Sequence, residues 1–494
     1  MRGLTRVIAV DVGATSYRVI EGIYSGGRLV MKVLARFRHG PVWLGGHYRW
    51  NVCEIAENVV KTIQAAAGSG EPVISIGFDT FGTDFGLLDG DGNLLDLPVA
   101  YRDDISDGIY EMYFQEEEKL YEEAGGTFAT TCTAHILKGM QVQRYSPLDK
   151  AEALLFMPDL LAFLMTGNAV NEVTIATTSR LLDLKNRRWN EAFIEELGIP
   201  VRIFHRLSES GTAVGRLRKE IAAGIPNLQE TEVIAVAGHD TASAVATVPN
   251  RAGCSFISSG TWSVKGIVTE HPYIDAKACK YKMCNEGQPW GKNRLLRNIT
   301  GMWLLEECVR SWKAEGKKIE IPQMVSLAFE KPEFPAVIYT DAPDFAKAGN
   351  MPEKIKEFCR RTRQPVPWTP VDIVQTIVRG LACEYRRHNE QLEQVTGEKI
   401  TDIYIMGGGR NNRYLNQRTA DVTGCRVTAG HPEATAMGNL LVQLWVHGDV
   451  LKTEQFPEIA GRDMPEEIFR PQNDYERETL YRGYLDMIAE YFEK

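Results

Sequence analysis

The sequence lacks any apolar run long enough to cross a bilayer. Its most apolar stretch, residues 153–165, contains Pro158 and Asp159, and it is shorter than the roughly 20 residues that a transmembrane helix needs. We expect a buried helix there, with Pro158 near its first turn. The N-terminal residues also lack the apolar stretch and cleavage site of a secretion signal. The sequence therefore predicts a cytoplasmic protein without a membrane partner.

Clustered basic residues are missing as well. The 494 residues include 56 Lys and Arg against 65 Asp and Glu, which gives a formal net charge of −9 at pH 7. Binding of a polyanion such as DNA requires a concentrated basic face. We therefore expect no nucleic-acid partner. The sequence leaves open whether the chain is a monomer or a homodimer.

Paired cysteines are the third absence. The nine cysteines are scattered and odd in number, and they form no Cys-x-x-Cys pair and have no histidine at zinc spacing. This pattern excludes a disulfide scaffold and a structural zinc site. We expect reduced thiols in packing positions.

Two segments far apart in the chain share one pattern. Residues 7–21 and 254–266 each read as an apolar strand, a turn of small residues and a second strand. Turns of Gly, Ser and Thr expose backbone N–H groups and hydroxyls that can donate to anionic oxygens. The length of the chain indicates roughly two to four structural units. We therefore expect two lobes whose hairpins contact one polyphosphate.

Residues 76–89 form the most informative stretch. They read as a buried strand followed by a second strand, with two glycines beside Asp79 and Asp84. Such glycines allow the backbone to approach a polyhydroxylated ligand closely. A glycine-rich β-hairpin that binds nothing fits the segment equally well, so the segment alone leaves both readings open.

A strand-to-helix junction follows the apolar residues 232–238. Ligands often bind at such junctions in α/β sheets. Asp240 there is either a general base or a structural N-cap, and His239 is either a ligand contact or a satisfied core residue. Asp11, at the end of an apolar strand, needs a partner if buried. That partner is either a cation or a nearby Lys or Arg.

The C-terminal half contains the clearest helix signals. Thr369 can cap, Pro370 suits the first helical position, and apolar residues recur at helical spacing up to Gly397. A strand at 402–406, the triplet Gly407–Gly409 and a helix start follow. This order indicates a nucleotide contact. A dinucleotide-binding turn is the alternative, but the third glycine of that template is missing. Residues 474–494 read as a further helix.

Taken together, these motifs resemble the FGGY family of carbohydrate kinases, in the superfamily of actin, hexokinase and heat-shock-chaperone ATPases. In order and spacing they cover nearly the whole chain. The matching motifs are residues 11–16, 79–85, 98–103, 157–159, 239–244, 258–263, 298–305, 407–409 and 433–439.

The resemblance implies an α/β fold with two ribonuclease-H-like lobes and a central active-site cleft. We expect an N-terminal lobe of residues 1–248 that binds sugar and phosphate, and a C-terminal lobe of residues 249–452 that binds the nucleotide. Residues 453–494 are expected to form a helical segment that packs back on the N-terminal lobe.

The resemblance also implies an enzyme that transfers the γ-phosphoryl group of ATP to the 1-hydroxyl of a ketose, in the first place L-rhamnulose, with Mg²⁺. Asp240 would be the catalytic base, and Asp11 would hold Mg²⁺ through water. The implied sugar contacts are Gly82, His239, Asp240, Thr241 and Asn298. The implied ATP contacts are Ala14, Thr15, Ser16, Tyr17, Arg18, Thr261, Glu306 and Gly408.

Several residues depart from the family pattern. Tyr17 stands where the phosphate turn has a small residue, and Phe81, Thr83 and the segment 130–137 differ beside the sugar. These changes leave L-fuculose, ribulose and xylulose as alternative substrates. Two other classes stay open: a sugar-binding regulator, suggested by Tyr17, and a nicotinamide-dependent oxidoreductase, suggested by the glycine triplet.

Overall fold

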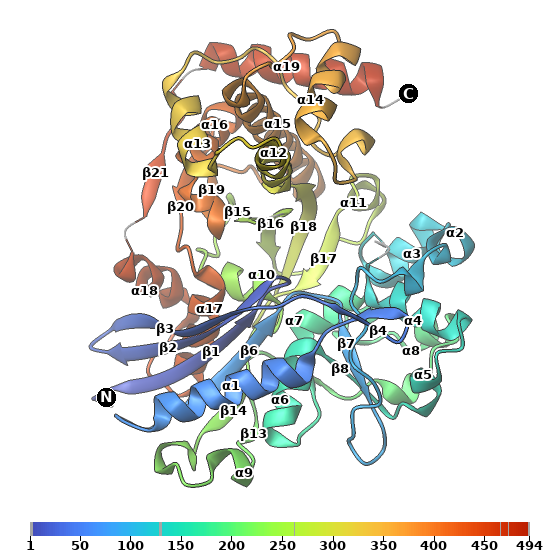
Figure 1. Cartoon of the computed structure of the whole chain (residues 1–494), viewed down its shortest axis with the longest axis vertical. Helices are drawn as coiled ribbons and strands as arrows, with labels where there is room; N and C mark the ends of the chain where they lie inside the picture. Colours follow the sequence, from blue (N-terminus) through green and yellow to red (C-terminus); the bar gives the residue numbers. More distant parts are fainter. Residues whose placement is uncertain (1–2, 128–130, 261, 465, 473, 493–494) are drawn as a thin grey trace. The chain divides into compact units, whose positions relative to one another are not determined.

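A computed structural model describes residues 3–127, 131–260, 262–464, 466–472 and 474–492 (Figure 1). The chain divides into two compact units, and both are assembled from separated segments. Unit 1 comprises Met1–Val248, Val268–Leu295 and Glu433–Met464, and unit 2 comprises Pro249–Ile267, Leu296–Pro432 and Pro465–Lys494.

Unit 1 is built on a six-stranded sheet. The strands, in spatial order, are β13 (Thr212–Arg216), β14 (Glu232–Ala235), β6 (Ser75–Thr80), β1 (Thr5–Val12), β2 (Ser16–Ser25) and β3 (Arg28–Arg38). Strands β1, β2 and β3 form an antiparallel meander, while β6 runs parallel to β1 and β14 parallel to β6. This arrangement confirms the predicted hairpin at 7–21.

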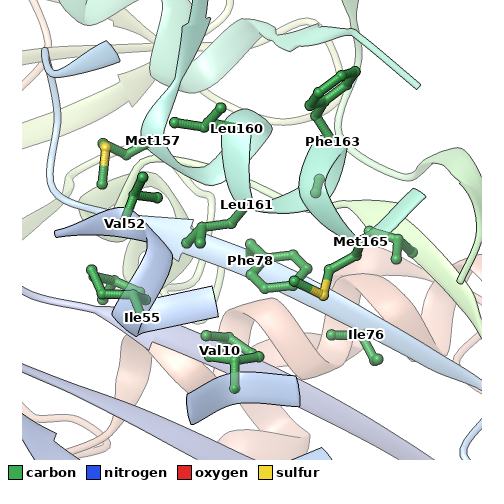
Figure 2. Close-up of a cluster of buried hydrophobic side chains, with 14 of the residues drawn as sticks. Val10, Val52, Ile55, Ile76, Phe78, Met157, Leu160, Leu161, Phe163 and Met165 are labelled. Atoms are coloured by element: carbon green, nitrogen blue, oxygen red, sulfur yellow. The ribbon is translucent and has the colours of Figure 1, made fainter. Parts of the chain in front are cut away.

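Helices cover both faces of this sheet. On one face, α1 (Val52–Ala67) and α6 (Met157–Thr166) pack against the strands. Figure 2 shows Val10 and Phe78 of the sheet beside Ile55 of α1 and Leu161 of α6. On the other face lies α17 (Ala434–Val446), which contacts β1 and β6. Every residue of β1 is therefore buried.

Helix α17 also approaches α10 (Asp240–Val245) closely. A Cβ added at Gly438 would lie 1.8 Å from the carbonyl oxygen of Ser243. Only glycine allows the two backbones to meet at this distance. The sequence segment 433–439 thus helps to position the start of α10.

The apolar run 153–165 differs from the single helix that we expected. Its first residues form strand β8 (Ala153–Phe156), which pairs antiparallel with β7 (Phe85–Leu88), and α6 begins only at Met157. Pro158 has no N–H for a strand ladder but suits a first helical turn. Because β6 and β7 lie in different sheets, the hairpin reading of residues 76–89 is wrong.

Shorter elements complete unit 1. They are β4 (Val42–Leu44), β5 (His47–Arg49), α2 (Ile109–Tyr113), α3 (Glu117–Ala124), α4 (Thr133–Val142), α5 (Ser146–Lys150), β9 (Asn171–Glu172), α7 (Val173–Ala176), β10 (Leu182–Asp183), β11 (Arg188–Trp189), α8 (Glu191–Glu196), β12 (Leu207–Ser208), α9 (Lys219–Ala222), α11 (Ala276–Lys280), β17 (Cys284–Gly287) and α18 (Phe456–Asp463).

The second sheet has the order β17-β18-β16-β15-β19-β20-β21. Its further strands are β15 (Cys254–Ser259), β16 (Trp262–Thr269), β18 (Asn293–Thr300), β19 (Asp402–Met406), β20 (Arg426–Ala429) and β21 (Glu467–Phe469). Strand β15 is antiparallel to β16 and parallel to β19, β19 is parallel to β20, and β20 is antiparallel to β21. The hairpin predicted at 254–266 is confirmed.

The predicted helix after Thr369 is α15 (Pro370–Thr396). Thr369 and Asp372 form a reciprocal capping box, and Gly397 ends the helix in the left-handed conformation with φ of 75°. The other helices of unit 2 are α12 (Trp303–Ala314), α13 (Ile321–Glu330), α14 (Met351–Arg361), α16 (Arg413–Thr423) and α19 (Asp474–Tyr491).

The C-terminal residues are divided between the units, whereas the sequence suggested one segment on the N-terminal lobe. Helix α18 contacts β3 and α17 of unit 1. Helix α19 contacts α15 and α16 of unit 2 because Tyr484 is buried there and donates a hydrogen bond to Glu384 at 2.6 Å.

The nine cysteines form no disulfide, and Cys53 is exposed. Among the described residues, no helix is both long and apolar enough to span a membrane.

Candidate functional site

Three carboxylates lie at the carboxyl ends of parallel strands in unit 1. Asp11 of β1 stands opposite Asp79 of β6 in the strand register, and Asp240 begins α10 after residues 236–239, which follow β14. Thr80 and His239 form a parallel bridge that continues the sheet to this point. The carboxyl edge of an open α/β sheet is where such folds bind ligands.

Asp11 and Asp79 are buried carboxylates whose negative charge is only partly balanced by nearby cationic groups. Burial raises the pKa of Asp11 to about 6 although Arg18 lowers it, and Asp240 contributes to the rise. Burial and the neighbouring Asp11 raise the pKa of Asp79 well above its ordinary value. Asn439 donates to Oδ2 of Asp79 at 2.6 Å, while Oδ1 is buried without a partner among the described residues. A cation would relieve this excess of negative charge.

The alternative salt-bridge partner of Asp11 is present. Arg18 faces Asp11 across the β1–β2 hairpin and forms ion pairs with Asp11 and with Glu433. The hairpin turn is closed by a hydrogen bond from the Gly13 N–H to the Ser16 carbonyl at 3.0 Å. Thr15 is exposed in this turn, and Ala14, Ser16 and Arg18 are half-buried. These residues are accessible to an anion.

Tyr17 differs from its neighbours, because its side chain lies in the core. It is 1% exposed, its ring stacks on Phe37 with centroids 4.9 Å apart, and Asn58 donates to its hydroxyl at 2.8 Å. Successive side chains of a strand point to opposite faces, so Tyr17 points away from the side of Ser16 and Arg18. The side chain is therefore turned away from the predicted ATP contact, which leaves the backbone of Tyr17 for that contact.

Asp240 does not act as the N-cap of α10. That position is held by His239, which makes no side-chain capping bond, and Asp240 is the first helical residue. The side chain of Asp240 is 35% exposed. Thr241 is buried and donates its hydroxyl to Oδ1 of Asp240 at 3.0 Å. The carboxylate is thus free of a capping role and open to a ligand.

His239 is surrounded by charged groups that sequence patterns did not reveal. Its Nε2 lies 3.4 Å from Oδ1 of Asp240, and its Nδ1 lies 3.3 Å from Oε2 of Glu286 and 3.2 Å from Nη2 of Arg294. Arg180 donates to the other oxygen of Glu286 at 3.3 Å. No local signal marked these residues, since Glu286 and Arg294 reach the junction on β17 and β18, and Arg180 comes from the turn after Thr177–Ser179.

The segment after β6 places a buried carboxyl beside Gly82. Burial raises the pKa of Asp84 to about 7, although Trp50 and the Tyr101 backbone donate hydrogen bonds to it. Thr83 has a positive φ of 77°. Such backbone strain in a non-glycine residue often occurs at ligand sites. Asp84 belongs to the family motif 79–85 but was not among the predicted site residues, although that motif could have indicated it.

Phe81 forms an aromatic wall on the same segment. Its ring centroid lies 4.8 Å from that of Trp50 and 6.0 Å from that of Tyr101. Gly82 is half-buried, and a Cβ added to it would meet Thr178 at 3.1 Å. The segment therefore combines an apolar surface with a carboxyl group and a closely packed glycine.

In unit 2, the glycine triplet follows β19. A Cβ at Gly409 would lie 2.1 Å from Oγ of Ser259, and one at Gly407 would lie 3.0 Å from the Ser259 carbonyl oxygen. Gly408 is exposed, and an added Cβ there would meet nothing within 4 Å. Packing against β15 thus explains the outer glycines, and Gly408 presents open backbone.

Two further predicted residues of unit 2 are at the surface. Asn298 is exposed on β18, and Glu306 is exposed in the first turn of α12. Thr261 lies outside the described residues. Gly260, just before it, is exposed, and its N–H donates to the Trp262 carbonyl at 2.9 Å.

Comparison with known proteins gives the family. Residues 6–247 match the N-terminal domain, and residues 255–447 the C-terminal domain, of the FGGY family of carbohydrate kinases. The chain belongs to this family. It is 36% identical over 483 residues to the rhamnulokinase of Bacteroides thetaiotaomicron, covering 97% of this chain and 99% of that protein. The rhamnulokinase of Oceanobacillus iheyensis is also 36% identical, over 88% of this chain and 92% of its own.

Solved structures confirm the fold. A ligand-bound xylulose kinase from Lactobacillus acidophilus is 14% identical and superposes with a TM-score of 0.80 over 98% of both chains. Glycerol kinase from Plasmodium falciparum with ADP is 15% identical, with a TM-score of 0.79 over 99% of this chain and 98% of that chain. The FGGY protein described here therefore has the actin-like ATPase fold of sugar kinases, as its motifs predicted.

Proposed function

We propose that the protein transfers the γ-phosphoryl group of ATP to the 1-hydroxyl of L-rhamnulose. Family membership supports the reaction class, and the two relatives at 36% identity, both rhamnulokinases, support the substrate. The observation that carries the proposal is the grouping of Asp11, Asp79 and Asp240 at one edge of the unit 1 sheet. Phosphorylation of another ketose is the second candidate, supported by the fold shared with xylulose kinase.

Asp240 is the proposed catalytic base. Phosphoryl transfer requires mainly alignment of the acceptor oxygen and stabilisation of charge on the transferring group. A partly exposed carboxylate without a capping role is suited to accept the proton of the sugar hydroxyl. We propose that Gly82, His239 and Thr241 contact the sugar beside it, together with Asn298 of unit 2.

The phosphate contacts are proposed for the exposed turn of unit 1. Backbone N–H groups and hydroxyls of Ala14, Thr15 and Ser16 would donate to phosphate oxygens. Arg18 forms ion pairs with Asp11 and Glu433 in this structure. Its guanidinium would bind a phosphate oxygen when the nucleotide is present. In unit 2 we propose ATP contacts from Thr261, Glu306 and Gly408.

Mg²⁺ fits the residues of unit 1. Asp11 is a buried carboxylate with a raised pKa, and the partnerless oxygen of Asp79 is next to it in the strand register. Carboxylate oxygens and water are the ligands that Mg²⁺ prefers. Asp11 would hold the ion, which would neutralise charge on the phosphates of ATP. Since ATP is a cytoplasmic substrate, we also propose that the protein acts in the cytoplasm.

The two alternative functions, a sugar-binding regulator and a nicotinamide-dependent oxidoreductase, are not supported by the structural features that suggested them. The regulator hypothesis rested on Tyr17 in the phosphate turn, but that side chain is in the core. The oxidoreductase hypothesis rested on the glycine triplet, but packing against Ser259 explains Gly407 and Gly409. Neither class retains a specific observation in its favour.

The test is a coupled assay of ADP release with Mg²⁺ over a panel of ketoses and polyols. We expect the highest kcat/KM for L-rhamnulose, and the 1-phosphate as the product. A higher value for L-fuculose, ribulose or xylulose would move the assignment to that ketose. ADP release that no sugar stimulates would refute the kinase proposal.

A further inference from the structure

The ring of His239 has a fully buried guanidinium on one side. Arg294 is 0% exposed, and its Nη2 lies within hydrogen-bond distance of three acceptor positions. These are the Gly287 carbonyl at 3.1 Å, Oε2 of Glu286 at 3.2 Å and Nδ1 of His239 at 3.2 Å. Because Nε of Arg294 also donates to the Gly287 carbonyl, at 3.2 Å, the two hydrogens of Nη2 are available for Glu286 and His239. A charged side chain without solvent contact keeps this geometry because departure from it would leave a buried charge unpaired.

This neighbour restricts the protonation of the ring. An arginine side chain has only N–H donors and stays protonated in proteins. A hydrogen on Nδ1 of His239 would therefore point at a cationic N–H group only 3.2 Å away. Nδ1 is instead suited to accept from Arg294, and a neutral imidazole then carries its hydrogen on Nε2.

The other side of the ring points to the same tautomer. Nε2 lies 3.4 Å from Oδ1 of Asp240, and an ionised carboxylate can only accept a hydrogen bond. A lone pair on Nε2 would face this oxygen without a hydrogen between them. A hydrogen on Nε2 satisfies both contacts at once.

The competing arrangements place a hydrogen on Nδ1, either in the other neutral tautomer or in a ring protonated on both nitrogens. Oε2 of Glu286 lies 3.3 Å from Nδ1 and would accept a hydrogen from it. However, Oε2 already accepts from Arg294, and Oε1 accepts from Arg180, so Glu286 is paired without the ring. The Glu286 carboxylate then serves to hold Arg294 in place.

We propose that Arg294 is a positioning residue that fixes neutral His239 in the tautomer with its hydrogen on Nε2, directed towards Asp240 and the sugar. This inference deepens the proposed kinase function and rests on it for the role of the sugar. His239 then donates to a sugar hydroxyl oxygen, while Asp240 remains the group that accepts the proton. A histidine held in this way cannot exchange roles with the base.

The backbone at this site has its own supports. Glu172 accepts from the Gly238 N–H at 3.0 Å, and the hydroxyl of Thr174 accepts from the His239 N–H at 3.3 Å. Loss of the Arg294 contact is therefore expected to affect the ring more than the chain path. This separation makes the proposal testable by substitution.

The decisive experiment is long-range ¹H–¹⁵N NMR of the full-length protein labelled with ¹⁵N-histidine, without sugar or ATP, at the pH of the kinase assay. His239→Gln assigns the signal. We expect the Nε2–H tautomer, and either the Nδ1–H tautomer or a ring protonated on both nitrogens would overturn the proposal. Since the spectrum needs no activity, an Nε2–H ring in a protein that phosphorylates no sugar would refute only the proposed function.

Substitution of Arg294 tests the same proposal by its effect on the tautomer of His239 and on the KM for sugar. Arg294→Lys keeps the charge and a donor, so it should keep the tautomer and most of the activity. Arg294→Met should produce both tautomers and raise the KM for sugar about tenfold or more, with the KM for ATP changed less than about twofold. An unchanged spectrum in Arg294→Met would contradict the proposal. If that variant does not fold, the wild-type spectrum still decides.

A matched control is Arg6→Lys. Arg6 is also a buried arginine of unit 1, but it pairs with Glu21 and with the carbonyls of Ala66, Ser69 and Glu71. Within the described part of the chain, it forms no hydrogen bond or ion pair with His239, Glu286 or Arg294. Its replacement should leave the His239 spectrum and the KM for sugar unchanged. If the control changed the His239 spectrum and the KM for sugar as much as Arg294→Met does, the effect would come from a general loss of packing in unit 1 and the proposal would be wrong.

Discussion

The two sheets repeat one topology but place different chemistry at equivalent positions. Each has an antiparallel hairpin, two strands parallel to its first strand, and an antiparallel strand at the edge. Just before the hairpin turn, unit 1 has Asp11 and unit 2 has Ser258. Their partners on the neighbouring parallel strand are Asp79 and Met406.

This difference separates two tasks that phosphoryl transfer requires. The carboxylates of unit 1 suit a cation and a proton acceptor, while the hydroxyl and backbone groups of unit 2 suit a nucleotide without adding negative charge. A repeated fold can thus supply two unlike surfaces, because the sheet fixes positions and leaves the side chains free to differ.

The largest effect is expected at Asp240, the proposed proton acceptor of unit 1. Asp240→Asn keeps the shape but removes the basic oxygen, so kcat should fall by about 10²–10⁴-fold while the KM for sugar changes little. Steady-state kinetics by ADP release check this. Asp91→Asn, in an exposed loop of the same unit, is the control and should retain activity. Unchanged turnover in Asp240→Asn would remove Asp240 from the mechanism.

Separate substitution of the two equivalent hairpin residues, Asp11 and Ser258, tests whether the two sheets carry different chemistry. Asp11→Asn should lower kcat/KM roughly 100-fold or more, because metal stabilisation of the transferring group contributes several kcal/mol. Ser258→Ala should change it less than about threefold, since this position carries no charge in unit 2. Titration of activity with Mg²⁺ is the measurement. Equal losses in both variants would mean that the two hairpins do not divide the chemistry.

The segments that follow β6 and β19, the strands parallel to β1 and β15, differ in pH response. Asp84 follows β6, and burial raises its pKa from 3.8 to about 7. Its folded pKa is therefore above the unfolded value, so the folded state holds an extra proton and loses stability as pH rises from about 4 to 7. Asp84→Asn should remove a penalty of a few kcal/mol at pH 8 and leave little difference near pH 4.

Denaturant unfolding of both proteins across this pH range measures the difference. The amide can still accept from Trp50 and the Tyr101 N–H, so the hydrogen bonds of the site are kept. A difference between the two proteins that stays constant with pH would show that Asp84 titrates as an ordinary carboxylate in the folded state.

The corresponding segment of unit 2 is the glycine triplet, and its effects should be smaller. Gly409→Ala would overlap Ser259 and should destabilise the fold by about 1–3 kcal/mol. Gly408→Ala meets nothing within 4 Å and should leave thermal unfolding unchanged while raising the KM for ATP a few-fold. Equal destabilisation by both substitutions would contradict the packing explanation.

Local sequence signals predicted the elements that local interactions determine. Thr369, Asp372 and Gly397 marked the ends of α15 because capping groups act within a few residues of a helix end. The two hairpins and the junction at Asp240 were predicted for the same reason.

Contacts between residues far apart in the sequence could not be predicted from such local signals. Arg294 and Glu286 contact His239 only because the folded chain brings β17 and β18 to that junction. Tyr17 was assigned to the phosphate turn by the family resemblance, whereas β2 already begins at Ser16 and the tyrosine side chain lies in the core. The strand at Ala153–Phe156 was missed because its partner is β7, far back in the chain.

Helix α17 has a consequence for how this protein can be divided. It lies within the residues that match the C-terminal family domain, yet it covers one face of the unit 1 sheet. A fragment cut at residue 248 would leave Val7, Ala9 and Ile20, which cluster with Leu440 in the intact protein, exposed to water. Expression of the first family domain alone should therefore yield an aggregating product, and co-expression with residues 433–464 should restore its solubility.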